Sequence, residues 1–300
     1  MNMTLAMNGK TRDGFIDVTG GKVWFKVVGN DKSTTPLLIL HGGPGSTHDS
    51  FEPLEELKNE RPIIFYDQLG GGNSDRPEDK SLWTVDRFVE EISQVINTLG
   101  LNKMHLLGHS WGSMLAIAYI LKYNQKVVSC ILSGSFLSSS MFEEDARYYV
   151  SQLPEKYREA ILKCEEQMDF ENKEYEEAMN YFYRQHLRRL DKVPKCVLRG
   201  RSKFGAEVYN YMWGPSEFTV TGTLKDYSLV DRLGEVEVPV LLIGGRYDEV
   251  KPSTVEFYKS KFKNAEIKFI EDASHCCYNE KPEEYLTIVR NFLDMIETKK

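Results

Sequence analysis

The sequence predicts an α/β fold in which a mostly parallel, doubly wound sheet carries an inserted helical cap. One observation is a series of short apolar runs with little alternation, separated by segments of helical periodicity. Unbroken apolar strands are typical of parallel sheets that are buried on both faces. A second observation is a change near Gly134, after which the chain is helical, charged and rich in aromatic residues until strand-like runs return at Val238. We therefore expect a core over residues 1–134 and 226–300, with a cap over residues 135–225.

The predicted elements begin with a β-hairpin, in which residues 15–18 and 23–28 flank a glycine turn. The runs that follow have the composition of buried strands; they are residues 36–40, 62–66, 104–107, 127–132, 238–243 and 265–270. A helix over residues 86–99 places one set of apolar side chains on a common side. These are Phe88, Val89, Ile92, Val95, Ile96 and Leu99. A closing helix is predicted over residues 282–296.

Composition narrows the class of protein. The 300 residues are 41% hydrophobic and 28% charged, which is typical of a soluble globular protein. A net charge of −7 argues against a nucleic-acid partner, which would need a basic stripe. The basic residues between Arg184 and Lys203 are interpreted as a solvated helical face. No apolar stretch approaches the ~18 residues that a membrane span needs.

The location and the cofactors follow from a few further patterns. The first seven residues lack a basic segment followed by an apolar one, so we expect no signal peptide. Five cysteines, an odd number without metal-ligand spacing, suggest a reducing compartment. We therefore expect a cytoplasmic protein with no bound metal or cofactor and no membrane contact.

The motif Gly108-His109-Ser110-Trp111-Gly112 lies between an apolar run and a helix-like stretch. G-x-S-x-G at a strand-to-helix boundary is the nucleophile elbow of α/β-hydrolases. The tight turn exposes the serine hydroxyl above the sheet, and the glycines let strand and helix approach each other. Ser110 is therefore the predicted nucleophile.

A serine hydroxyl also needs a base to take its proton and a third group to orient that base. In this fold the partners follow in the order Ser, Asp or Glu, His. Asp248 comes just after the predicted strand 238–243, and His275 just after 265–270. The ends of parallel strands collect at one edge of the sheet, where such folds hold their ligands. The predicted catalytic triad is Ser110, Asp248 and His275.

Acyl transfer further needs two donors for the developing oxyanion. One is expected to be the backbone N–H of Trp111, the residue after the nucleophile. The other is expected from Gly43 in the loop 41–45, although a tight loop with positive φ would also explain that glycine. The segment 67–74 is attributed mostly to turn chemistry. Cys276 and Cys277, which directly follow His275, are expected to be unpaired small hydrophobic residues.

These motifs together resemble one family. The segments 41–45, 66–70 and 73–74, with the Ser110 elbow, Asp248 and His275, are similar to the prolyl iminopeptidase family of α/β-hydrolases over nearly the whole chain. Three cap segments resemble the archaeal, tricorn-interacting members of that family; they are residues 153–158, 180–187 and 214–222.

The resemblance implies a serine aminopeptidase that releases N-terminal residues, preferentially proline, from short peptides through an acyl-enzyme. It implies that Glu217 and Glu249 bind the free N-terminal ammonium and that Tyr209 lines the same pocket. It also suggests a functional link to an upstream protease that produces peptides.

Other activities stay open from the sequence. A broad-specificity amino-acid amidase or an esterase of the same fold would share the triad. An epoxide hydrolase is disfavoured because such enzymes carry Asp where this chain has Ser110. A non-catalytic ligand receptor on the same fold is a further alternative. Activity on N-acetylated substrates would separate an esterase from an aminopeptidase.

Overall fold

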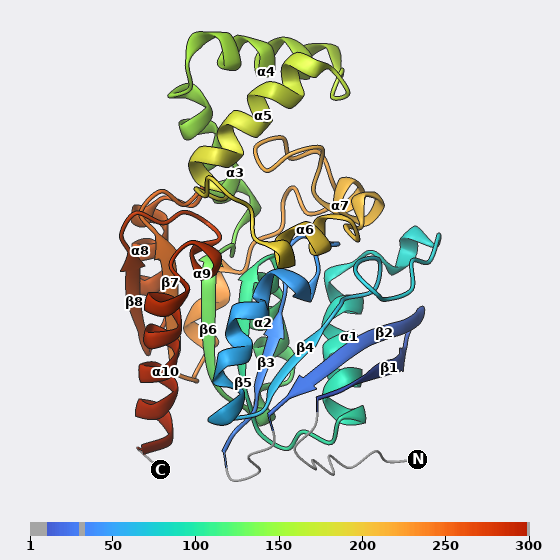
Figure 1. Cartoon of the computed structure of the whole chain (residues 1–300), viewed down its shortest axis with the longest axis vertical. Helices are drawn as coiled ribbons and strands as arrows, with labels where there is room; N and C mark the ends of the chain where they lie inside the picture. The colour runs from blue at the N-terminus through green and yellow to red at the C-terminus, as the bar shows by residue number, and fades with distance from the viewer. Residues whose placement is uncertain (1–10, 30–33, 299–300) are drawn as a thin grey trace.

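A sheet of eight strands runs through the part of the chain that the computed structural model describes, residues 11–29 and 34–298 (Figure 1). Its strand order is β1-β2-β4-β3-β5-β6-β7-β8. The hairpin strands β1 and β2 are antiparallel, and β2 pairs antiparallel with β4, whereas all pairs from β4 through β8 are parallel. The strands are β1 (Arg12–Val18), β2 (Gly21–Val28), β3 (Leu37–Leu40), β4 (Ile63–Tyr66), β5 (Met104–Ser110), β6 (Val127–Ser135), β7 (Val240–Gly245) and β8 (Ala265–Ile270). This confirms the predicted, mostly parallel sheet.

The central strands are apolar throughout because both faces of the sheet are covered. In β3, Leu38 and Leu40 belong to the core on one face, whereas Leu37 and Ile39 belong to the core on the other. Successive side chains of a strand point to opposite faces, so a strand between two cores needs an apolar residue at every position. The unbroken runs of the sequence therefore report burial on both sides.

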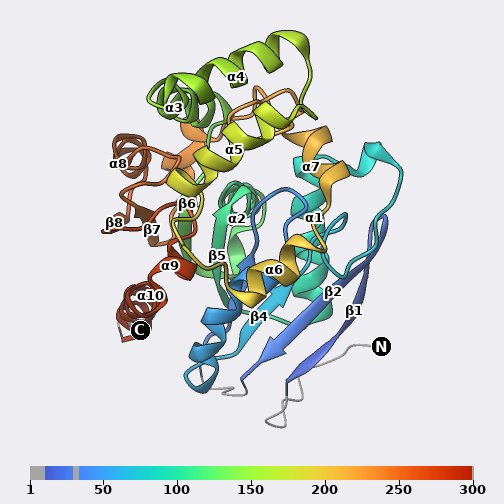
Figure 2. The ribbon, with the colours of Figure 1, turned by 45° about the horizontal axis from the view of Figure 1, so that its top comes forward.

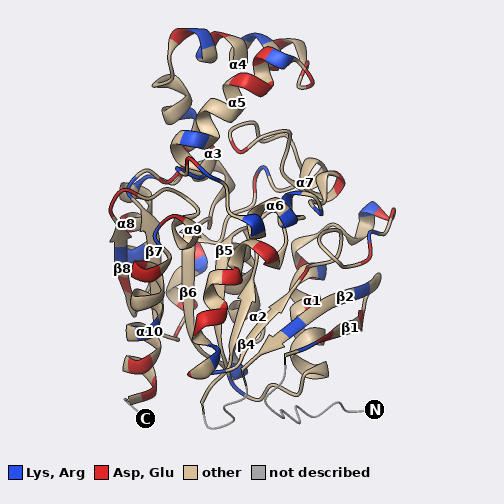
Figure 3. Cartoon of the chain, in the orientation of Figure 1, with Lys and Arg blue, Asp and Glu red and all other residues tan. Residues whose placement is uncertain are grey.

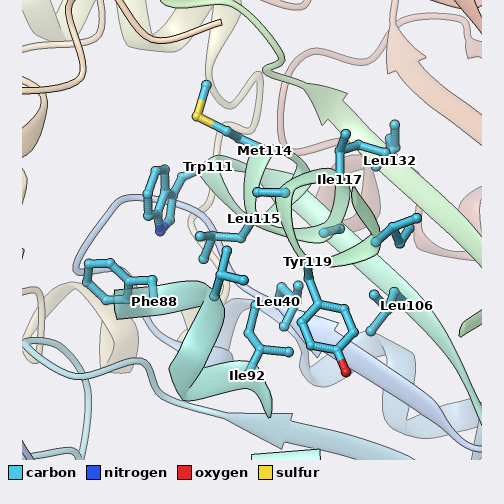
Figure 4. Close-up of a cluster of buried hydrophobic side chains, with 14 of the residues drawn as sticks. Leu40, Phe88, Ile92, Leu106, Trp111, Met114, Leu115, Ile117, Tyr119 and Leu132 are labelled. Atoms are coloured by element: carbon cyan, nitrogen blue, oxygen red, sulfur yellow. The ribbon is translucent and has the colours of Figure 1, made fainter. Parts of the chain in front are cut away.

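Helices cover the two faces (Figures 1 and 2). The core on the first face receives side chains from α1 (Val85–Thr98), α2 (Trp111–Lys122) and α8 (Pro252–Lys261). Figure 4 shows part of this core, where Phe88 and Ile92 of α1 approach Trp111 and Leu115 of α2. The core on the second face receives side chains from η1 (His48–Asn59), α9 (Cys277–Glu280) and α10 (Pro282–Thr298). Shorter 3₁₀ segments complete this part: η2 (Lys80–Leu82), η3 (Asn124–Lys126) and η4 (Val230–Glu235).

Helix α1 shows why the local sequence was informative. Thr84 caps its first turn, since its side chain accepts a hydrogen bond from the backbone N–H of Arg87. The helix ends at Thr98, and Gly100 follows with a positive φ of 68°. All six side chains predicted for its apolar side are buried in the core. The predicted helix is confirmed with a shift of one residue at each end.

Five helices between β6 and β7 lie above the carboxyl ends of the parallel strands (Figures 1 and 2). They are α3 (Ser139–Ser151), α4 (Glu155–Gln167), α5 (Lys173–His186), α6 (Lys195–Arg201) and α7 (Ala206–Met212). The first three enclose a small apolar core of their own, joined by Phe218. The helical character of the insertion matches the prediction, while the proposed boundaries at 134/135 and 225/226 stay predictions.

The 3₁₀ helix η1 was not predicted. It is twelve residues long, with Pro53 inside it. A proline has no backbone N–H to donate and disfavours the interior of an α-helix, so the sequence argues against a helix at this point. The first seven residues, for which we expect no signal peptide, lie outside the described residues. In the described part of the chain, every helix is too short or too polar to cross a membrane.

Candidate active site

Ser110 occupies the turn between β5 and α2. Its φ is +53°, a conformation that a residue with a side chain adopts only under strain. The flanking glycines are required: a Cβ on Gly108 would lie 2.2 Å from the carbonyl oxygen of Gly112, and one on Gly112 would lie 2.0 Å from that of Leu40. The backbone therefore has the shape of the predicted elbow. Strand β5 runs to Ser110 itself, three residues beyond the predicted end.

Asp248 and His275 meet below the cap. Asp248 follows β7, His275 follows β8, and both are buried. His275 Nδ1 lies 2.8 Å from Asp248 Oδ1, which also accepts a hydrogen bond from the backbone N–H of Val250 at 3.0 Å. Burial would lower the pKa of His275, but the charge and hydrogen bond of Asp248 outweigh it and raise that pKa above 6.5. The carboxylate thus orients the imidazole and favours its protonated form.

Sequence reasoning missed a glycine that makes room for this pair. Gly134, near the end of β6, has a φ of +54°, and a Cβ there would lie 2.7 Å from the ring of His275. Any larger residue would displace the imidazole. A positive φ cannot be predicted from the sequence of this segment. The one available signal is that Gly134 lies where the apolar run of β6 ends.

Ser110 and His275 line one cavity of about 660 Å³, together with Gly43, Tyr209 and Glu217. Within the described residues no hydrogen bond joins Ser110 to His275. The Nε2 nitrogen of His275 instead lies 3.3 Å from Glu249 Oε1. Catalytic hydrogen bonds often tighten only when substrate binds, so this geometry leaves His275 a candidate base for Ser110.

The two predicted ammonium ligands lie close enough to influence each other. Glu249 is 0% exposed, and neither of its carboxylate oxygens has a hydrogen-bond partner in the part of the chain that the structure describes. Glu217 accepts a hydrogen bond from the Tyr209 hydroxyl at 2.9 Å. Burial raises the pKa of both carboxyl groups, and the charges of Glu217 and Asp248 raise that of Glu249 further. Neither glutamate forms an ion pair with a lysine or arginine of the described chain, so a bound cation would favour the ionised form of both carboxyl groups.

A hydrogen-bonded network holds the loop of Gly43. Trp111 Nε1 donates to Gln68 Oε1 at 2.8 Å, and Gln68 Nε2 donates to the carbonyl of His41 at 2.9 Å. The backbone N–H of Gln68 donates to His41 Nε2 at 2.9 Å, so His41 carries its proton on Nδ1 and donates it to the carbonyl of Gly42 at 2.8 Å. Burial lowers the pKa of His41, which agrees with a neutral ring.

This network bears on the predicted oxyanion donors. The carbonyl of Gly42 and the N–H of Gly43 belong to one planar peptide unit, so His41 fixes the direction of that N–H. Gly43 has a φ of +117°, and a Cβ there would lie 2.6 Å from the nitrogen of Gly45. The backbone of this tight loop therefore also requires a glycine at position 43. The sequence attributes the segment of Gln68 mostly to turn chemistry, whereas the side chain of Gln68 contacts Trp111, which lies 43 residues further along the chain.

The remaining residues singled out in the sequence divide into two groups. Cys276 and Cys277 are buried and unpaired, as expected, but Cys276 lines the cavity. The sequence predicts that the basic residues between Arg184 and Lys203 form a solvated helical face. This prediction is wrong for Arg188, which lines the cavity and whose Nε is buried. Over the described ranges, no group of three or more His, Cys, Asp or Glu side chains is placed to hold a metal ion.

Comparison with known proteins gives a consistent result. The alpha/beta hydrolase fold family matches residues 35–282. A proline iminopeptidase of Heyndrickxia coagulans is 43% identical over 285 residues, covering 95% of this chain and 99% of that protein. One of Thermoplasma volcanium is 38% identical over 289 residues, covering 95% and 97%. The crystal structure of a proline iminopeptidase of Mycobacterium smegmatis has a TM-score of 0.89 at 33% identity, covering 96% and 99%. This chain therefore belongs to the proline iminopeptidase family of the α/β-hydrolase fold.

Proposed function

We propose that this protein is a serine aminopeptidase that releases N-terminal residues, preferentially proline, from short peptides. The observation that carries the proposal is the pair Glu217 and Glu249, which lie near the hydrogen-bonded Asp248 and His275 and have no lysine or arginine partner within residues 11–29 and 34–298. A buried carboxylate without a partner costs stability, and the ammonium of an unblocked N-terminus would supply the missing charge. An esterase has no use for such a pair.

The steps follow from the positions of the side chains. The glutamates hold the N-terminal ammonium and place the first peptide bond over Ser110. His275 takes the proton of the Ser110 hydroxyl as it attacks the carbonyl, and gives it to the leaving amine as the acyl-enzyme forms. A water molecule, deprotonated by the same imidazole, then hydrolyses the ester. The N–H groups of Trp111 and Gly43 are the proposed donors to the oxyanion.

The contact between Glu249 and His275 adds a dependence on the substrate. The Nε2 nitrogen of His275, which must face Ser110 during attack, lies 3.3 Å from Glu249 Oε1. An ammonium that binds Glu249 would draw this carboxylate away from the imidazole and free Nε2 for Ser110. Tyr209 would position Glu217 through its hydrogen bond.

We further propose that residues 135–225 form the cap, that the protein is cytoplasmic, and that an upstream protease supplies its peptides.

The test is a comparison of substrates in the wild type and in Ser110→Ala. Pro-naphthylamide should be cleaved, whereas N-acetyl-Pro-naphthylamide should be cleaved poorly because it has no ammonium. Ser110→Ala should lower kcat by roughly 10⁴- to 10⁶-fold with the fold intact by circular dichroism. Equal activity on the blocked substrate would favour the esterase, and a variant that kept a tenth of wild-type turnover would refute the mechanism.

A further inference from the structure

The cavity extends well beyond the space around Ser110 and Glu217. Its volume of about 660 Å³ lies in the range that encloses a drug-sized ligand. A second part of its wall comes from the chain between α5 and α7, and this part carries Arg184, Arg188 and Arg201. Leu187, Val193 and Phe204 lie among them. An aminopeptidase acylates Ser110 with a single residue, so this second part is available to the leaving peptide.

Arg188 is the arginine of this wall that has a buried donor nitrogen without a hydrogen-bond partner among the described residues. Its Nη2 donates to the Sγ of Cys276 at 3.0 Å, whereas its Nε is buried and finds no acceptor in the described chain. It forms no ion pair with a carboxylate in the described chain. Glu280 is near enough to act on its charge, but its oxygens accept hydrogen bonds from Ser274 and from the backbone N–H of Arg189. A buried guanidinium donor without an acceptor is costly, and an anionic ligand would satisfy it.

Arg201, at the end of α6, adds positive charge to the same wall. Burial and the charge of Arg188 lower the pKa of Arg201, which agrees with two guanidinium groups close together. Asp191 also lines the cavity but forms no ion pair with either arginine within the described residues. This part of the cavity therefore favours an anion.

The position of Arg188 relative to the reaction also matters. Cys276, which it contacts, directly follows His275, the group that protonates the leaving amine in the proposed mechanism. The ammonium of the substrate is held by Glu217 and Glu249, which leaves Arg188 for the leaving side. On that side the anion of a short peptide is its C-terminal carboxylate, whose two oxygens match the fork of a guanidinium.

We propose that Arg188, assisted by Arg201, binds the free C-terminal carboxylate of the leaving peptide. This inference rests on the proposed aminopeptidase function and narrows its substrates to dipeptides and tripeptides with both ends free. Longer peptides would place their carboxylate beyond the arginines and would gain nothing from them.

The experiment compares kcat/KM for Pro-Gly and Pro-Gly-amide, with Pro-naphthylamide as the reference. In the wild type, Pro-Gly should exceed its amide by about 10- to 100-fold, as for a hydrogen bond between two charged groups. In Arg188→Gln this ratio should fall below about threefold. Arg189→Gln is the matched control, because Arg189 stacks over the ring of Tyr247 and does not line the cavity. It should keep the wild-type ratio.

The measured quantity is the ratio of kcat/KM for Pro-Gly to kcat/KM for Pro-Gly-amide. A general loss of activity lowers both values and leaves this ratio unchanged. Equal kcat/KM for acid and amide in the wild type, with Pro-naphthylamide cleaved, would overturn this inference and leave the aminopeptidase intact. Failure to cleave Pro-naphthylamide would instead refute the proposed function. If Arg188→Gln lowered kcat/KM for all three substrates equally, Arg188 would be structural and the inference wrong. Should that variant not fold, Arg201→Gln measures the same ratio, which should again fall.

One further arm identifies the source of the carboxylate. Pro-Asp-amide and Pro-Asn-amide differ only in the charge of the second side chain. The proposal expects them to differ by less than the Pro-Gly pair. A preference for Pro-Asp-amide that is lost in Arg188→Gln, without a preference for Pro-Gly over its amide, would assign the arginines to acidic side chains and overturn the C-terminal assignment.

Discussion

Replacing Glu249 by glutamine separates binding of the substrate amine from the rest of catalysis. The substitution keeps the shape of the side chain and removes an ionisable group that is fully buried and has no hydrogen-bond partner among the described residues. Truncating one partner of a buried charge pair costs about 2 to 4 kcal/mol, which is roughly 30- to 900-fold in kcat/KM. We expect a loss of that size on Pro-naphthylamide. A p-nitrophenyl ester without an amine should lose much less, because Ser110, Asp248 and His275 remain.

The same substitution should change how stability depends on pH. Burial, and then the charges of Glu217 and Asp248, raise the pKa of Glu249 well above 4.5. The folded protein then holds this proton more tightly than the unfolded chain. The resulting stability is fully present below pH 4.5 and is lost as the pH rises through the folded pKa. Each unit of elevation corresponds to about 1.4 kcal/mol, and glutamine, which does not titrate, avoids this loss. The Tm of the variant relative to wild type should therefore increase from pH 5 to pH 8.

The assay combines kinetics on both substrates with calorimetric Tm values at pH 5 and pH 8. Glu256→Gln is the matched control, since Glu256 is exposed on α8 and should alter neither quantity. Equal losses on the amine and the ester would mean that Glu249 supports the fold or the triad. A Tm difference that does not change with pH would show that the carboxylate is ionised at no cost in the folded protein.

Two further predictions follow from the site. Because Asp248 raises the pKa of His275 above 6.5 and the base must be neutral, the acid limb of kcat/KM for Pro-naphthylamide should have its midpoint above pH 6.5; a midpoint below that value would contradict the assignment. Gln68→Leu removes the acceptor of Trp111 and the donor to His41, so steady-state kinetics should show kcat lowered by about 10- to 100-fold with KM nearly unchanged. A raised KM with kcat intact would instead give Gln68 a role in substrate binding.

Much of the fold could be predicted because its elements carry local patterns. The spacing of the apolar residues predicts the buried side of α1, and Thr84 caps the first turn of this helix. The positions of Ser110, Asp248 and His275 could be predicted because each lies at or just after the end of a strand, and parallel strands end at one edge of the sheet. The helix η1 escaped prediction because Pro53 lies inside it, and an internal proline argues against an α-helix.

By itself, the sequence determined which residue types stand at the strand ends, and hence the elbow, the candidate triad and the family. Only the tertiary structure decided their surroundings. It placed Glu249 against His275 and left its carboxylate without a hydrogen bond, and it turned Arg188 from an expected solvated residue into part of the cavity wall. The physical reason is that burial and electrostatic pairing depend on which distant segments pack together. Local spacing constrains the backbone of each segment, whereas the environment of a charge is set by all the segments that surround it.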